Sequence, residues 1–282
     1  MAGMSDGFRV FRRIVASGAV LLLAVVYLFP VLYMVMGSFL PDDEVLTRGF
    51  SWAGWFTGDL SWNNYRDVFA RTDLLRFMGN SLLINGTIVA LGLLINSLAG
   101  YALARMSWRG RDKVLGLVLL LMIIPFEAIA VPLFYQMTVI GLRDTYLVQI
   151  LPFIGNAFAI FWFYTFFLDL PAEWEEAARI DGAGPWRTFF TIILPNSKPC
   201  LATVAILTFL THWSAYLWPL LVTVGERVRP LPLAIAQFYT LPPLQWGDIL
   251  AFGVMMVLPV LAVFLVFQRW FIRGIASSGI KG

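Results

Sequence analysis

Apolar and polar residues follow one another along this chain in long blocks. Six blocks of mostly apolar residues are long enough to be membrane spans, because a helix needs about 20 residues to cross about 30 Å of hydrocarbon. They occupy approximately residues 14–37, 78–104, 114–140, 146–168, 200–223 and 249–271. The pattern predicts an all-α, polytopic membrane protein with six transmembrane helices.

Composition supports this class. Hydrophobic residues make up 60% of the 282 residues and charged residues 13%, against about 25% charged in ordinary soluble domains. The single cysteine, Cys200, excludes an intramolecular disulfide, and no cysteine or histidine cluster suggests a bound metal. A net charge of +3 is too small to indicate a nucleic-acid partner.

The positions of lysine and arginine predict the orientation. Of the 20 basic residues, 13 lie before the first block, after the second, after the fourth, and at or beyond the C-terminal end of the last, where Arg269 is included. Basic residues mark the cytoplasmic side of a membrane protein. We therefore expect both termini and the loop 169–199 in the cytoplasm of a bacterial or archaeal cell. The expected division is a cytoplasmic segment 1–13, a transmembrane domain 14–271 and a cytoplasmic tail 272–282.

Prolines interrupt several blocks, at positions 30, 125, 132, 152, 219 and 259. Proline removes a backbone hydrogen bond and kinks a helix. Two readings fit: the helices bend around a gated passage, or these are the ordinary prolines of membrane helices, where they are common.

The loop 169–199 is the most informative polar stretch. Three glutamates open a predicted short helix from Glu173 to Ile180, where carboxylates favour the positive end of the helix dipole. Gly182 fits a helix stop, and Gly184-Pro185 fits the start of a second helix, which Pro195 is expected to end. By composition alone, this loop is either a docking element for a partner or an amphipathic stretch on the membrane surface.

The spacing of this loop resembles a known family. Glu176-Ala177-Ala178, Gly182 and Ile192-Ile193-Leu194-Pro195 follow the signature E-A-A, three residues, G, nine residues, I-x-L-P. This is the loop of permease subunits of binding-protein-dependent ABC importers. Further matches lie at Tyr101–Arg105 and Ser197–Pro199, and together they are similar to the carbohydrate branch of the maltose-transporter type.

The resemblance implies a mechanism and partners. In this family the loop forms a coupling helix that docks on a cytoplasmic ATPase, and ATP-driven closure of two ATPases switches the bundle from inward-open to outward-open. The expected coupling contacts are Glu176, Ala177, Ala178 and Gly182. The expected partners are a second permease subunit, two ATPase subunits and an extracytoplasmic solute-binding protein. The cargo implied is a sugar or a related polyol, including glycerol-3-phosphate.

The chain contains no phosphate-binding loop of the form G-x-x-x-x-G-K-[ST]. It is therefore expected to be a transport subunit and not an enzyme, with ATP and magnesium bound by the partner ATPase and no cofactor of its own. Two alternatives stay open: a permease for a non-carbohydrate solute, and a membrane-embedded transferase.

Ionisable and polar groups inside the predicted spans are candidates for the solute pathway, because such groups are costly in a membrane. The candidates are Glu127, His212, Trp213 and Tyr216. For each, a structural role within the bundle is the competing reading. Asn85, Asn96, Gln149 and Asn156 are expected to form hydrogen bonds between helices.

Aromatic residues outside the predicted spans lie in the loops 38–77 and 225–247. Both loops are candidates to meet the solute-binding protein, and a belt at the lipid interface is the alternative.

Overall fold

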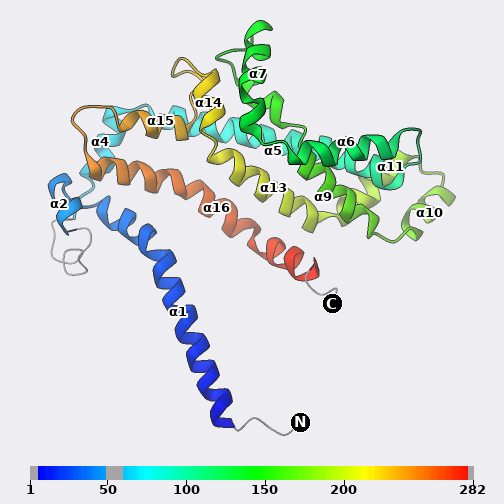
Figure 1. Ribbon diagram of the computed structural model, residues 1–282, viewed down its shortest axis with the longest axis horizontal. Coiled ribbons are helices and arrows are strands. Elements are labelled where there is room, and N and C mark those ends of the chain that lie inside the picture. Colours follow the sequence, from blue (N-terminus) through cyan, green and yellow to red (C-terminus); the bar gives the residue numbers. More distant parts are fainter. Residues whose placement is uncertain (1–5, 49–59, 279–282) are drawn as a thin grey trace. The chain divides into compact units, whose positions relative to one another are not determined.

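The structure is a computed structural model that describes residues 6–48 and 60–278, with side chains described for residues 11–47 and 60–268. The predicted aromatic residues Trp52, Trp55 and Phe56 lie outside the described residues. Every regular element in the described ranges is a helix, which confirms the predicted all-α class. Figure 1 labels most of these helices along the chain.

The first half of the chain forms α1 (Asp6–Gly37), α2 (Asp42–Arg48), α4 (Asn63–Arg71), α5 (Leu74–Arg105), α6 (Arg111–Ile123) and α7 (Phe126–Val139). The middle of the chain forms α8 (Tyr146–Ile150), the 3-10 turn η1 (Leu151–Phe153), α9 (Ala157–Leu168), α10 (Glu173–Ile180), α11 (Pro185–Thr188), the π-helix η2 (Phe189–Ile193) and α12 (Leu194–Asn196). The remaining helices are α13 (Lys198–Trp213), α14 (Leu217–Val222), α15 (Leu231–Phe238) and α16 (Trp246–Ser278).

Four helical segments of the described chain are long and apolar enough to cross a membrane, at Phe11–Gly37, Leu74–Arg105, Tyr146–Leu168 and Trp246–Gln268. The number rises to six if each of two bent helix pairs forms one span. The prediction of a multi-span membrane protein is thus confirmed.

Two of the predicted spans differ from straight helices. The block 114–140 breaks after Ile123, and α6 and α7 meet at 103°. Pro125 has no backbone N–H and disfavours helical geometry at Ile124, so the helix stops there. The prediction of one continuous helix over 200–223 is also wrong, because α13 ends at Trp213 and α14 begins at Leu217.

The chain divides into two compact units, Met1–Leu74 with Ile235–Val257, and Leu75–Ala234 with Leu258–Gly282. Each unit is described by itself. In the first, Asn64 of α4 donates from Nδ2 to the carbonyl oxygens of Ser38 and Leu40, at 2.9 and 2.8 Å. Asp42 accepts from the backbone N–H of Gly247 at 3.1 Å. Polar side chains therefore join the segments after α1 to the start of α16.

Arg71 contacts several residues between α15 and the start of α16 in the first unit. Its Nη1 donates to Asp248 Oδ2 at 2.5 Å and to Gln245 Oε1 at 2.6 Å. Its Nη2 donates to the carbonyl oxygens of Leu241 and Pro243, and its guanidinium lies 4.7 Å from the ring centre of Phe238. One side chain thus orders the whole connection between α15 and α16.

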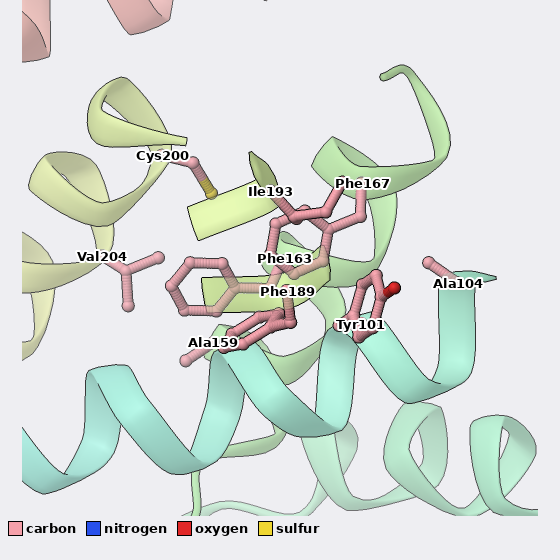
Figure 2. Close-up of a cluster of buried hydrophobic side chains, with 9 residues drawn as sticks. All are labelled: Tyr101, Ala104, Ala159, Phe163, Phe167, Phe189, Ile193, Cys200 and Val204. Atoms are coloured by element: carbon pink, nitrogen blue, oxygen red, sulfur yellow. The ribbon is translucent and has the colours of Figure 1, made fainter. Parts of the chain in front are cut away.

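In the second unit, α5 and α9 pack closely along a cluster of buried side chains (Figure 2). The cluster comprises Tyr101, Ala104, Ala159, Phe163, Phe167, Phe189, Ile193, Cys200 and Val204, from α5, α9, η2 and α13. Gly100 permits the contact, because a Cβ there would lie 2.6 Å from Phe163 Cβ and 3.0 Å from the Tyr164 nitrogen. Small residues at helix crossings allow such approaches in membranes.

We expect Gly100→Ala to destabilise the protein by on the order of 1–3 kcal/mol, because the added methyl group overpacks the α5–α9 contact. Thermal unfolding in detergent measures the change. The matched control is Gly86→Ala in the same helix, where a Cβ meets nothing within 4 Å. The gain in helix propensity is shared by both variants, so equal stability of the two proteins would contradict the prediction.

Polar side chains of α5 and α8 fix the segment before α15. Asn80 donates to the carbonyl oxygens of Arg227 and Arg229, and Gln149 donates to that of Val228 at 2.7 Å. Asn96 donates to the Ile154 carbonyl and accepts from the backbone N–H of Asn156. The side chains of Asn96 and Gln149 thus join separate segments, as expected, whereas that of Asn156 accepts from the backbone N–H of Ala159 and caps its own helix, α9. For Asn85 the bond runs to Ser81 within its own helix.

Candidate functional site

The polar loop between α9 and α13 folds as its local sequence predicts up to Gly184. Helix α10 spans Glu173–Ile180 with three glutamates in its first turn, and Gly182 has a φ of +75°. Glycine adopts this left-handed conformation without the steric cost of a side chain, so it ends the helix sharply. Gly184 then caps α11, which begins at Pro185.

The returning arm of the loop differs from the prediction. Four residues of α11 continue directly into the π-helix η2 and then into α12, so Pro195 does not end the helix. The break comes at Ser197, and the arm meets α13 at a 78° bend. Phe189 and Ile193, four residues apart, are buried in the cluster of Figure 2. The arm is thereby fixed to α5, α9 and α13.

The four predicted coupling residues differ in accessibility. Glu176, Ala177 and Gly182 are exposed, whereas Ala178 is only 3% exposed. In a helix, adjacent residues point about 100° apart, which explains how neighbouring alanines take different sides. The loop therefore presents a small, acidic surface to solvent and packs Ala178 inward.

Two large apolar residues on this loop were not among the predicted site residues. Ile180 is 87% exposed and Trp186 is 68% exposed, one on each side of Gly182. Both interrupt the polar stretch around Gly182, which is the signal that would have found them. Both large apolar side chains therefore face solvent on the same loop as the four predicted residues.

The solute-pathway candidates do not form one site. His212 and two threonines lie on one face of α13, at positions 208, 211 and 212, and line a cavity of about 280 Å³ with Asn156 and Phe158 of the α9 region. Trp213 points elsewhere: it is 3% exposed and stacks on Phe209 at 5.1 Å. Tyr216 is exposed beyond the end of α13, and Glu127 is exposed in the first turn of α7.

His212 also lines a second, smaller cavity. It has a volume of about 20 Å³ and is lined in part by Asn85 and Gln149. Asn85 Oδ1 and Gln149 Oε1 are buried and have no hydrogen-bond partner in the described part of the chain. This volume suffices for one water molecule. His212 thus lines both cavities, and its ring packs on Phe153 at 4.8 Å.

In the outer segments, Trp62 is 63% exposed and Tyr239 is 50% exposed. Both are in the first unit, where Trp62 packs edge-on against Phe39 and Tyr239 against Trp246. Each ring therefore packs against a neighbouring aromatic ring while about half or more of its residue surface stays exposed.

Comparison with known proteins relates this chain to transport components. Residues 88–277 match the family described as binding-protein-dependent transport system inner membrane component. The chain is 38% identical over 261 residues to the arabinooligosaccharides transport system permease protein AraQ of Halalkalibacterium halodurans, covering 92% of this chain and 93% of that protein. It is 30% identical to the lactose transport system permease protein LacG of Rhizobium radiobacter, covering 94% and 95%.

Solved structures show the same fold. A chain of a bacterial ABC transporter involved in the import of the acidic polysaccharide alginate superposes with a TM-score of 0.84 at 24% identity, covering 96% of this chain and 100% of that chain. A chain of the MetNI methionine ABC transporter superposes with a TM-score of 0.54 at 21% identity, covering 70% and 93%.

Proposed function

Because the chain belongs to the family of inner membrane components of binding-protein-dependent transport systems, we propose that it imports a saccharide by alternating access, driven by ATP hydrolysis on a separate subunit. The observation that carries this proposal is α10, an acidic helix of eight residues with a small, exposed surface on a loop between membrane helices. Membership of a family of transport components excludes the alternative function, a membrane-embedded transferase.

In this proposal α10 is the coupling helix. Glu176, Ala177 and Gly182 meet the ATPase directly, with Ile180 and Trp186 as apolar contacts on either side. Ala178 supports the helix from within, since it is buried. A cleft that receives α10 must fit closely over alanine, so the size of residue 177 limits the approach. The docking arrangement requires loop 169–199, and with it both termini, in the cytoplasm.

The assembly proposed around this chain has four further subunits: a second permease, two ATPases that bind ATP and magnesium, and an extracytoplasmic solute-binding protein. One comparison structure supports this arrangement by its composition, since it is an alginate ABC transporter in complex with a pentasaccharide-bound periplasmic protein. The exposed rings of Trp62 and Tyr239 are the surfaces we assign to the binding protein.

The proposed cargo is a sugar or a small oligosaccharide. Relatives named for arabinooligosaccharides and lactose support it, and others named for sn-glycerol-3-phosphate extend the range to polyol phosphates. The cavity beside α13 has suitable chemistry: hydroxyls at 208 and 211, the imidazole of His212 and the face of Phe158. Hydroxyl groups bind through hydrogen bonds, and aromatic faces pack on the apolar side of sugar rings.

The proposal is tested by purifying the tagged chain from its native membrane and measuring uptake after reconstitution. We expect co-purification of a second permease, an ATPase and a binding protein, and ATP-driven uptake of arabinotriose that unlabelled lactose reduces and methionine does not. Purification as a lone polypeptide would refute the assembly. Uptake of methionine in place of the saccharides would establish the alternative, a permease for a non-carbohydrate solute.

We expect Thr208→Val to raise the half-saturating saccharide concentration by about 2- to 10-fold, the equivalent of one hydrogen bond of about 0.5–1.5 kcal/mol. The isosteric change keeps the volume and removes the hydroxyl from the cavity. Initial uptake rates at varied solute concentration measure it. The matched control is Thr203→Val on the same helix, whose hydroxyl donates to the Pro199 carbonyl at 2.9 Å and does not line the cavity. An equal shift in both variants would contradict a solute contact at Thr208.

A further inference from the structure

Arg105, the last residue of α5, contacts both the segment between α9 and α10 and the first turn of α10. Its Nη2 donates to the carbonyl oxygens of Leu170 and Pro171, at 2.6 and 3.4 Å, in the segment between α9 and α10. Its Nε lies 3.5 Å from Oε2 of Glu175 in the first turn of α10. The side chains of Arg105 and Glu175 are 13% and 16% exposed, so this is a largely buried ion pair.

Tyr101, one turn earlier on α5, fixes the other arm of the loop. Its ring lies 6.2 Å from that of Phe167 and 5.2 Å from that of Phe189, which follows α11 (Figure 2). Its hydroxyl lies beside the Glu175 carboxylate. The final turns of α5 therefore contact the loop both before and after α10.

The ion pair is incompletely bonded. Arg105 Nε and Glu175 Oε1 are buried, and neither has a hydrogen-bond partner in the described part of the chain. Leaving buried polar atoms unpaired is costly, so a small shift that brings the two groups into hydrogen-bonding distance is favoured. Space for a shift exists nearby, because a cavity of about 140 Å³ with apolar walls separates α5 from Pro185 and Trp186.

We propose that the Arg105–Glu175 pair is a latch that transmits displacement of α10 to the transmembrane helix α5. The inference rests on the proposed docking of α10 on an ATPase, and it assigns the step after docking. A force on α10 acts on Glu175 and on the Leu170 carbonyl, and the guanidinium passes it to the end of a 32-residue helix. Arg105 is thus a positioning residue that acts through Glu175, without touching solute or nucleotide.

A pair that only stabilised the fold would alter the amount of protein in the membrane. A latch alters the number of ATP molecules hydrolysed per solute imported. The test uses the complete importer, reconstituted with its ATPase and binding protein, and measures ATP hydrolysis and arabinotriose uptake on the same samples. The variants are Arg105→Met, Glu175→Gln and the charge exchange Arg105→Glu with Glu175→Arg. Arg111→Met is the matched control, since its pair with Asp112 is exposed.

Each single variant is expected to retain the ATPase and to raise the ratio of ATP hydrolysed to solute imported by about tenfold, within the range found for residues that couple distant sites. The charge exchange restores the ratio towards the wild-type value, and Arg111→Met leaves it unchanged. If Arg105→Met does not reach the membrane, Arg105→Lys keeps the buried charge paired and is expected to raise the ratio about threefold.

A wild-type ratio in the single variants, or in Arg105→Lys, would overturn the latch. Loss of the ATPase on purification would also overturn it, since Glu175 would then be a docking contact. A wild-type importer that shows no ATP-driven uptake would refute the proposed function, and the latch with it. Uptake and ATP hydrolysis that are both unchanged in the variants, with an active wild type, would refute the latch alone.

Discussion

Ala177→Trp is expected to reduce solute uptake to a tenth or less of the wild-type rate, while the protein still inserts into the membrane. Ala177 is exposed in the middle of α10, so a larger side chain costs the fold little. It would prevent the helix from seating in a cleft, and overpacking a close contact costs about 1–3 kcal/mol, which corresponds to about 5- to 150-fold in affinity. Uptake and co-purification of the ATPase, measured on the same membranes, would show the loss of transport and the weaker docking together.

The control for this prediction is Ala177→Ser, which keeps the residue small and is expected to transport normally. Gly182→Asp provides a second probe, because it adds a charge and a side chain at a φ of +75°. We expect it to uncouple transport as well. Wild-type uptake by Ala177→Trp would contradict the docking of α10.

The second large effect is expected at Arg71. Arg71→Met should destabilise the first unit by about 3–5 kcal/mol, because it leaves the carboxylate of Asp248 buried without its cation. Asp248 is 1% exposed, and Arg71 also holds Gln245 and two backbone carbonyls. Thermal unfolding in detergent and limited proteolysis between residues 238 and 246 are the measurements.

Arg66→Met is the matched control, since Arg66 is exposed on the same helix. The double variant Arg71→Met with Asp248→Leu should regain much of the lost stability, because replacing both members of a buried ion pair by apolar residues is often neutral. A double variant as unstable as the single one would mean that the carbonyl contacts of Arg71, and not its charge pairing, stabilise this region.

The parts of the fold that local chemistry determines were predictable from the sequence. Glutamates at its start, alanines within it and Gly182 after it define α10, and the structure places the helix at Glu173–Ile180. The membrane class followed from the length of the apolar blocks. These signals lie within a few residues of the feature that they predict.

Features set by distant contacts could not be predicted. Hydropathy is continuous across 200–223, yet the helix stops at Trp213 and resumes at Leu217, where Trp218 donates to the Val148 carbonyl on α8. Pro125 indicated a kink, but the 103° angle depends on how α6 and α7 pack on other helices. The partner of Arg71 is 177 residues away in the sequence.

The candidate site shows the same division. Sequence spacing identified the loop, whereas the different exposures of Ala177 and Ala178 depend on which side of α10 packs inward. The sequence predicts that both His212 and its neighbour Trp213 line the solute pathway. In the helix they point apart, so only His212 reaches the cavity. The sequence does not predict the Arg105 contact, because arginine at the end of a membrane helix is usually an interfacial anchor.

The burial of Cys200 has a practical consequence. The only thiol of the chain is 3% exposed and lies among apolar side chains, where cysteine is poorly reactive. A cysteine introduced at an exposed loop position, such as Trp186, would therefore be labelled selectively by a water-soluble maleimide. Such a variant can carry a single fluorophore or spin label on the loop that contains α10, and Cys200 does not have to be replaced first.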